Sequence, residues 1–333
     1  MTDRDEFDQL ARRVSNWGRW GDNDELGTLN FITPAKVAAA GQSIRTGERV
    51  SLGMDLGPDG PQGGPRAKVS PFRINPLHFM FLDGNDAGPQ DPAVQVLGST
   101  AAGIAASHGD GLFRFNEDYV IMPLQAATQW DALSHVYYDG QMYNGVSASR
   151  VSSLGASVHS IRSVGEACGV MSRGVLLDVC RFRGVEYIDG GEPISPEELE
   201  SVAQGEGVEV SPGDVVLVRT GWMTHFRRYH DGDYLGTGIR WDCAEWLHRN
   251  SVAAIAADNK AVEASHVRSL AATRLPLHLL ALRDMGLLLG ELFDLDLLAE
   301  RCASDGRYDF FLAAPALRFV GGVATPLNPV AVR

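Results

Sequence analysis

The hydrophobic residues of this chain are grouped in short runs rich in branched side chains, separated by polar and glycine-rich stretches. Short apolar runs of this kind are typical of buried strands, because an amphipathic helix shows a longer pattern with a period of about 3.6 residues. The runs that predict buried strands are residues 119–124, 174–179, 214–220, 252–257 and 310–314.

Start and stop signals predict helices between these runs. Residues 195–198 read Ser-Pro-Glu-Glu, a capping box with proline at the first helical position. Asp294 or Asp296 is expected to cap a second helix, and a helix over 276–285 is expected to end at Gly286. Strands and helices alternate without a regular β–α–β rhythm. The prediction is therefore an α/β fold with mixed sheets and peripheral helices, not a doubly wound sheet.

Composition bounds the size and the partners of the protein. The chain has 333 residues, 44% of them hydrophobic, which is enough for one large core or for two domains fused without a linker. We expect one domain over residues 1–333, with residues 1–45 as an N-terminal arm packed on it. The formal net charge of −13 and the lack of a Lys/Arg cluster argue against a nucleic-acid partner. The charged N-terminus argues against a secretory signal, and no apolar run approaches the ~18 residues of a membrane helix. Four widely spaced cysteines without a CxxC pair fit free thiols in a reducing cytoplasm.

One segment concentrates residues that carry chemistry. It contains Gln125, Thr128, Gln129, Asp131 and His135, and it follows an apolar run, where sites commonly form. If the chain turns helical after Thr128, Asp131 and His135 are four residues apart and share a face. A carboxylate beside an imidazole binds a cation, or it forms an acid/base pair in which the carboxylate fixes the histidine tautomer. A capped turn with a surface ion pair is the structural alternative.

This segment resembles the signature His-x-Gly-Thr-His-x-Asp-x-x-x-His of the cyclase family, which includes kynurenine formamidase and isatin hydrolase. Other segments resemble the family in the same order along most of the chain, and that order makes the resemblance specific. In the signature, Thr128, Asp131 and His135 match, whereas Gln125, Ala127 and Gln129 depart. The other similar segments are 19–30, 33–34, 142–145, 173–178, 212–222, 258–263, 276–278 and 290–291.

The resemblance implies a swivelling β/β/α fold, assembly into dimers or larger homo-oligomers, and a site built from the signature and a distant His and Glu. Carried over by position, the signature ligands fall on Gln125, Gln129 and Asp131. His135 matches the last signature histidine, a ligand or a proton carrier, and His278 and Glu291 match the distant pair. The residues expected to hold a metal are Asp131, His135, His278 and Glu291.

The two glutamines change the expected metal chemistry. An amide oxygen is a weak neutral ligand beside an imidazole nitrogen, which argues against a tight dizinc centre. Two hypotheses stay open. In the first, one weakly bound divalent metal, Mn²⁺ or Zn²⁺, occupies the cluster. In the second, no metal binds, and Gln125 and Gln129 donate N–H groups to a substrate carbonyl. In both, His135, Asp131 and Gln129 are the candidate catalytic residues.

Neighbouring residues are candidates for binding the substrate. Trp130 is expected to wall an aromatic substrate, or to pack in the core. Tyr143 and Asn144 present polar groups, although Asn-Gly is also a turn signal. Gln125 completes the polar set, and His78 is a candidate from a separate segment, where the alternative is a structural histidine.

The function that these residues predict is an enzyme acting on a small-molecule carbonyl attached to nitrogen or oxygen. The reaction would be amide, lactam or lactone hydrolysis, or ring closure in the reverse sense. The alternatives are a metal-free cyclase or dehydratase of a biosynthetic pathway, and a catalytically silent relative that binds a ligand.

Overall fold

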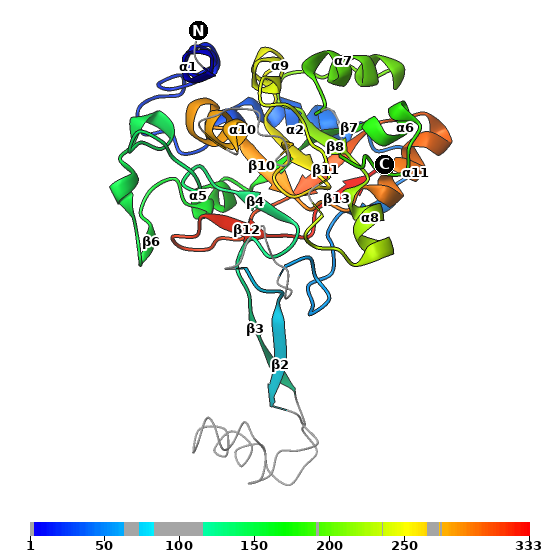
Figure 1. Cartoon of the computed structure of the whole chain (residues 1–333), viewed down its shortest axis with the longest axis horizontal. Helices are drawn as coiled ribbons and strands as arrows, with labels where there is room; N and C mark the ends of the chain where they lie inside the picture. The colour runs from blue at the N-terminus through cyan, green and yellow to red at the C-terminus, as the bar shows by residue number, and fades with distance from the viewer. Residues whose placement is uncertain are drawn as a thin grey trace.

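The computed structural model describes residues 3–62, 73–82, 116–190, 193–234, 236–264, 273 and 275–333. Within these residues, one nine-stranded mixed sheet forms the centre of the molecule, and its strand order is β1-β13-β11-β7-β8-β9-β10-β4-β12 (Figure 1). The strands are β1 (Arg49–Ser51), β4 (Gln129–Asp131), β7 (Val170–Asp178), β8 (Val215–Arg219), β9 (Ala254–Ala257), β10 (Leu288–Glu291), β11 (Asp309–Ala314), β12 (Ala324–Pro326) and β13 (Val330–Val332).

The middle of the sheet is parallel and buried. Strands β7, β8, β9 and β10 pair in parallel register, and almost every residue of β8, β9 and β10 is buried. Continuous apolar runs are the expected sequence of strands covered on both faces. The buried strands predicted within 174–179, 214–220 and 252–257 are therefore confirmed. Residues 310–314 also form a strand of the sheet, β11, in which buried and partly buried residues alternate. The α/β fold with mixed sheets is confirmed with them.

The prediction of a buried strand at 119–124 is wrong about its burial. Residues Glu117–Ile121 do form a strand, β3, but every residue of it is exposed. It pairs with β2 (Leu77–Leu82) in a separate hairpin that projects from the body (Figure 1). Branched and aromatic residues favour a strand in either setting, so the local sequence does not distinguish a strand of the sheet from one that leaves it.

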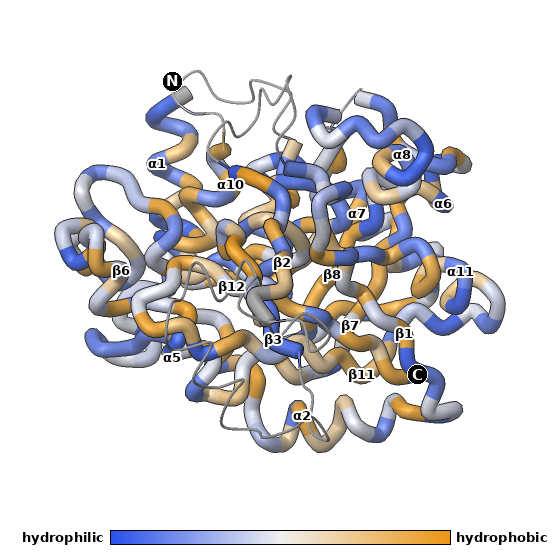
Figure 2. The backbone as a smooth tube through the Cα atoms, turned by 90° about the horizontal axis from the view of Figure 1, so that it is seen from below, coloured by the Kyte–Doolittle hydropathy of each residue, from blue (hydrophilic) through white to orange (hydrophobic). Residues whose placement is uncertain are grey.

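Helices surround the sheet. Helices α1, α7 and α9 lie on the side away from the hairpin (Figure 1). Hydrophobic residues follow the central strands β7 and β8 (Figure 2). No helix among the described residues is long and apolar enough to cross a membrane. The α-helices are α1 (Asp3–Val14), α2 (Pro34–Gly41), α5 (Ile161–Glu166), α6 (Val179–Arg183), α7 (Pro196–Gly205), α8 (Trp222–Tyr229), α9 (Cys243–Arg249), α10 (Pro276–His278) and α11 (Asp296–Asp305).

The predicted helix starts have different outcomes. Ser195 caps α7, since its hydroxyl accepts a hydrogen bond from the backbone N–H of Glu198. The cap predicted at Asp294 or Asp296 is wrong, because α11 begins after Leu295 and no side chain caps it. Both carboxylates instead bind Arg227 of α8. Ion pairing with a residue distant in sequence has replaced the local cap.

The helix predicted over 276–285 is α10 followed by a π-helix, η4 (Leu279–Met285). It ends at Gly286, as expected, in a left-handed conformation with φ 67°. Single π-helical turns are frequent at functional sites. The N-terminal arm packs here: α1 contacts η4 and α9, and the indole N–H of Trp17 donates to the carbonyl oxygen of Arg283 at 2.7 Å.

Candidate functional site

Two neighbouring strands bring the candidate residues together. Strand β4 pairs antiparallel with β10, with Glu291 opposite Gln129 and Gly290 opposite Trp130. Because side chains alternate along a strand, Gln129, Asp131 and Glu291 lie on one face of the sheet. The helix considered for the segment after Thr128 is not formed, since residues 129–131 are a strand. The strand pairing, and not a helical i, i+4 relationship, therefore builds the site.

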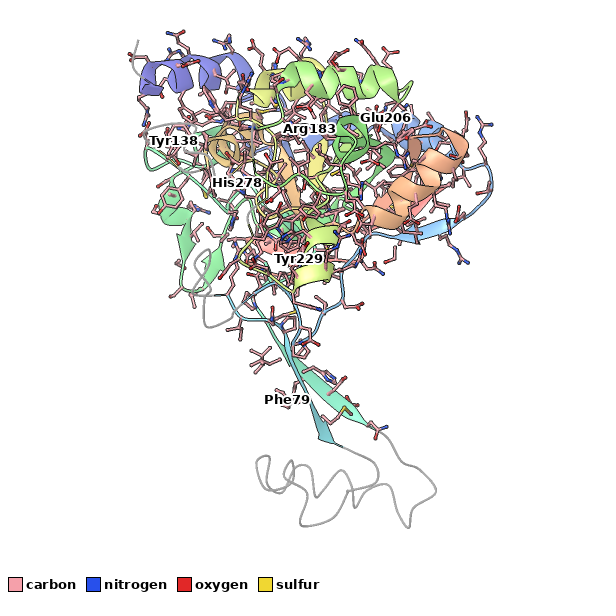
Figure 3. All side chains as sticks on the ribbon, turned by 45° about the vertical axis from the view of Figure 1, so that its right-hand side comes forward. Phe79, Tyr138, Arg183, Glu206, Tyr229 and His278 are labelled. Atoms are coloured by element: carbon pink, nitrogen blue, oxygen red, sulfur yellow. The ribbon has the colours of Figure 1, made fainter. Side chains whose placement is uncertain are left out.

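His278 reaches this face from α10. One ring nitrogen, Nε2, lies 3.3 Å from Oε1 of Glu291, and the other, Nδ1, lies 2.7 Å from Oε1 of Glu263. Glu263 also accepts the backbone N–H groups of Leu277 and His278. It therefore fixes both the ring and the start of the helix that carries it. Figure 3 places His278 inside the body, away from Phe79 on the hairpin.

Glu263 was not among the predicted site residues. It lies in segment 258–263, one of the segments that resemble the family. A lone glutamate that follows Ala261 and Val262 carries no local pattern that marks it as the partner of a histidine at position 278. That resemblance was the one available signal.

The cluster fits a single divalent cation. Ligand atoms of Asp131, His278 and Glu291, all buried, lie within 4.8 Å of one another. Oδ2 of Asp131 and Oε1 of Gln129 are buried without a hydrogen-bond partner within the described part of the chain. Unsatisfied buried oxygens are costly, and a cation would satisfy them. A histidine whose other nitrogen binds a carboxylate is also the usual arrangement at metal sites.

Gln129 bridges the carboxylates of Asp131 and Glu291. Its amide Nε2 donates to Oδ1 of Asp131 at 3.2 Å and to Oε2 of Glu291 at 3.1 Å. Because both carboxylate oxygens are hydrogen-bond acceptors, the N–H₂ group of the amide faces them and its oxygen does not. Rotation of the amide by half a turn would present its oxygen to a cation. The same side chain is therefore compatible with either state of the site.

The charges in the cluster are strongly coupled. Burial raises the pKa of Asp131, against the attraction of His135, and the charge of Glu291 raises it further. Burial alone would raise the pKa of Glu291, but the hydrogen bond and the charge of His278 leave it lowered. For His278, burial opposes protonation, yet hydrogen bonds to Glu263 and Glu291 raise the pKa to about 10. Two buried carboxylates thus require a compensating positive charge, from His278 or from a metal.

His135 lies at the edge of the cluster. Its Nε2 is 3.9 Å from Oδ1 of Asp131, and its side chain is 20% exposed, whereas that of Asp131 is fully buried. It is not within the three-residue group that could hold a metal. A histidine between a buried carboxylate and solvent is well placed to carry protons.

Two cations that the sequence analysis did not single out lie near the cluster. Arg73 Nη1 is 4.0 Å from Oε2 of Glu291 and donates to the carbonyl oxygen of Gln125 at 3.5 Å. Lys260 donates to the carbonyl oxygen of Pro61, and its charge interacts with Glu291 and Arg73. Burial lowers the pKa of Lys260 to about 8, against the attraction of nearby carboxylates. Isolated basic residues carry no sequence pattern that would reveal this proximity.

The remaining substrate-binding candidates lie apart from the cluster. Trp130 points to the opposite face of β4, where it is buried, packs on Phe293 and donates to the carbonyl oxygen of Ala314. His78 is on the projecting hairpin and pairs with Asp118 at 2.7 Å. These positions match the core-packing alternative for Trp130 and a structural role for His78.

Tyr143 and Asn144 hold the N-terminal arm. The Tyr143 hydroxyl donates to Asp24 at 3.0 Å, and the amide of Asn144 donates to the carbonyl oxygen of Gly21 at 3.1 Å. Gly18 donates its N–H to the Asn144 side chain in return. Two segments that resemble the family, 19–30 and 142–145, are thus in direct contact.

Comparisons with known proteins place this geometry in a family. A family model described as "Putative cyclase" matches residues 31–264. No curated protein matches the chain in sequence. A crystal structure of a novel cyclase is 36% identical, covers 96% of this chain and 100% of its own, and has a TM-score of 0.82.

Isatin hydrolases share the fold at lower identity. Isatin hydrolase A from Ralstonia solanacearum is 18% identical, covers 90% of this chain and 97% of its own, and has a TM-score of 0.60. An isatin hydrolase bound to the product analogue thioisatinate is 16% identical, covers 89% of this chain and 94% of its own, and has a TM-score of 0.58. On the family match and the relative at 36% identity, this chain belongs to the cyclase family.

Proposed function

We propose that this chain is an enzyme that acts on a carbonyl attached to nitrogen or oxygen, by amide, lactam or lactone hydrolysis or by ring closure. Membership of the cyclase family supports a hydrolase or cyclase. The observation that carries the proposal is the buried group Asp131, His278 and Glu291, with Glu263 bound behind the imidazole. A cation held by this group would also contact the buried oxygens of Asp131 and Gln129 that have no hydrogen-bond partner among the described residues.

Asp131, His278 and Glu291 would hold one divalent metal, and the amide oxygen of Gln129 is available as a further weak ligand. Mn²⁺ binds better to carboxylate, amide and imidazole donors than to nitrogen and sulfur donors. Such a metal would polarise the substrate carbonyl or lower the pKa of a bound water. Glu263 would keep the Nε2 atom of His278 directed at the cluster.

The chain's own residues have separate roles in this proposal. His135 moves the proton between the reacting group and solvent, since its imidazole lies beside the buried carboxylate of Asp131 and is partly exposed. The carboxylate of Asp131, 3.9 Å from Nε2, would attract the protonated imidazole of His135. Arg73 and Lys260 supply positive charge beside Glu291, which would stabilise negative charge that develops on the carbonyl oxygen.

A metal-free reaction is the second candidate, and the contacts of Gln129 favour it specifically. Its N–H₂ group already satisfies one oxygen of each carboxylate, the role that a cation would otherwise have. In that case protonated His278 compensates the charge of Glu263 and Glu291, and Gln129 turns its N–H toward the substrate.

Metal content and turnover test the proposal together. Purified protein would be analysed for bound metal, and its melting temperature would be measured with Mn²⁺, Zn²⁺ or EDTA. Turnover would be screened on formamides, isatin and lactones. Glu291→Gln should abolish any metal-dependent rise in melting temperature, whereas Glu206→Gln, a carboxylate outside the cluster, should keep it. Turnover that does not depend on any metal would favour the metal-free candidate. If Glu291→Gln keeps both turnover and metal binding, both candidates are rejected.

A further inference from the structure

The backbone that carries His135 is a turn, and hydrogen bonds determine its position. The turn follows β4 and covers residues 132–135, where the N–H of His135 donates to the carbonyl oxygen of Ala132 at 2.9 Å. His135 is the last residue of the turn, and its Nε2 lies 3.9 Å from Oδ1 of Asp131. Whatever holds this turn therefore sets the position of the imidazole relative to the cluster.

Two hydrogen bonds connect the turn to distant parts of the chain. At its start, the N–H of Ala132 donates to the carbonyl oxygen of Val323, just before β12, at 3.0 Å. In its middle, the N–H of Ser134 donates to the carbonyl oxygen of His159 at 3.2 Å. Ser134 directly precedes His135. The position of His159 therefore affects the part of the turn next to the candidate proton carrier.

His159 has an unusual backbone conformation. Its φ is 56°, in the left-handed region that residues other than glycine seldom adopt. Such a conformation persists only where the surrounding structure imposes it. The residue is 2% exposed, and its Nε2 donates to the carbonyl oxygen of Tyr143 at 3.0 Å. This bond fixes the ring of His159, and a different contact fixes its backbone.

The backbone of His159 is held by Glu25 of the N-terminal arm. One carboxylate oxygen, Oε2, accepts the N–H of His159 at 2.8 Å and the hydroxyl of Ser163, in α5, at 2.7 Å. Hydrogen bonds to an ionised carboxylate are roughly twice as strong as those between neutral groups. His159 is thus bound at its N–H by Glu25 and at its carbonyl oxygen by Ser134. A change of its backbone angles would break one of these bonds.

The arm is anchored on the body beside Glu25. Asp24 accepts the hydroxyl of Tyr143 at 3.0 Å and the N–H of Gly27 at 2.8 Å. Gly27 lies so close to Gly286 that an added Cβ would be 2.0 Å from the carbonyl oxygen of Gly286. The body of the molecule therefore fixes the position from which the Glu25 carboxylate reaches His159.

We propose that Glu25 is a positioning residue for His135 and acts through the backbone of His159. The carboxylate holds His159 in its left-handed conformation, and His159 holds Ser134. The turn then presents the imidazole of His135 to Asp131. This inference rests on the proposed function only in assigning proton transfer to His135, because the positioning is the same whichever reaction the site performs.

The reactivity of the His135 ring tests the positioning without any substrate. Diethyl pyrocarbonate modifies neutral imidazoles, and peptide mass spectrometry gives the rate at each histidine. Glu25→Ala should raise the rate at His135, whose side chain is 20% exposed, several-fold. The rate at the exposed His230 is the internal reference and should not change. Glu25→Gln should behave like the wild type, because one amide oxygen can accept both bonds that Oε2 accepts.

Turnover on a confirmed substrate tests the consequence for the reaction. Glu25→Ala should lower kcat by up to about 10²-fold with KM unchanged, because a small displacement of a catalytic group is costly. Glu25→Gln should restore kcat. Trp17→Phe is the matched control, since it removes another anchor of the arm, the hydrogen bond to the carbonyl oxygen of Arg283. It should alter neither kcat nor the modification rate at His135.

Melting temperatures would verify that each variant is folded, and Glu25→Asp, one methylene shorter, is a milder change with the same expected direction. An unchanged modification rate at His135 in Glu25→Ala and Glu25→Asp overturns the proposal. So does a Trp17→Phe variant that acts like Glu25→Ala, since the arm would then contribute only overall stability. A raised modification rate with unaltered kcat supports the positioning and contradicts the proposed role of His135 in the reaction.

Discussion

Glu263 binds Nδ1 of His278 at 2.7 Å, and this contact determines which imidazole nitrogen faces the cluster. An ionised carboxylate only accepts hydrogen bonds, so Nδ1 carries the proton and Nε2 is directed at Glu291. The pair is fully buried, and Glu263 is held in turn by two backbone N–H groups. Glu263 is therefore a positioning residue for His278.

Replacing Glu263 with glutamine should weaken metal binding by roughly 10- to 100-fold, the usual effect of losing a partner behind a metal-binding histidine. The N–H groups of Leu277 and His278 bind different oxygens of Glu263, so the single amide oxygen keeps one of these bonds, and the fold should persist with some loss of stability. Calorimetric titration with Mn²⁺ would measure the change. Unchanged affinity would show that the orientation of His278 does not depend on the carboxylate.

His135→Ala should lower kcat by about 10²- to 10⁴-fold, the contribution expected of a general acid or base. Because His135 lies outside the three-residue group, metal content should be unchanged. Turnover on a confirmed substrate and metal analysis of the same preparation would separate the two roles. A variant that loses its metal would instead make His135 a ligand, the other role implied by the resemblance.

Gly290→Ala should destabilise the protein by roughly 1–3 kcal/mol, the usual range for overpacking a core. A Cβ at this position would lie 2.5 Å from the Trp130 ring and 2.7 Å from Cβ of Ala256, inside the sheet next to Glu291. Urea denaturation would measure the loss. Gly41→Ala is the matched control, because it lies in helix α2 with nothing within 4 Å of the added atom and should be neutral or slightly stabilising.

The central strands could be predicted because their apolar runs are long enough to be buried whatever surrounds them. The cap at Ser195 could be predicted because its partners are three residues away. The gathering of Asp131, His278 and Glu291 followed from the family resemblance, whereas the sequence alone gave no distance between them. Local pattern and resemblance therefore each account for a different part of the structure.

The missed features depend on contacts between residues far apart in sequence. Asp296 caps no helix because Arg227, 69 residues earlier, binds its carboxylate. The exposure of β3 is decided by where the chain leaves the sheet, which its branched residues do not encode. Glu263 has a role only because helix α10 returns His278 to it. No local periodicity carries such information.

The stability of the protein should fall as pH rises because of Glu206. Its Oε1 accepts the backbone N–H of Asp178, but Oε2 is buried without a partner among the described residues. Burial and the charge of Asp178 raise the pKa of Glu206 to about 8, from 4.5 in the unfolded chain, against the lowering effect of that hydrogen bond. Between these values the folded state binds more protons, so the free energy of unfolding decreases with increasing pH.

Glu206→Gln should remove this penalty. At pH 4 and below the pH-dependent penalty should be absent, because Glu206 is then mostly protonated in both the folded and the unfolded chain. At pH 8.5 the variant should be more stable by roughly 1–3 kcal/mol, measured by urea denaturation. Glu166→Gln is the control of opposite sign: hydrogen bonds from Arg318 and Arg162 lower the pKa of this exposed carboxylate, so its replacement should give no gain at high pH. Equal stability of wild type and Glu206→Gln at both pH values would mean that Glu206 is solvated in the folded protein.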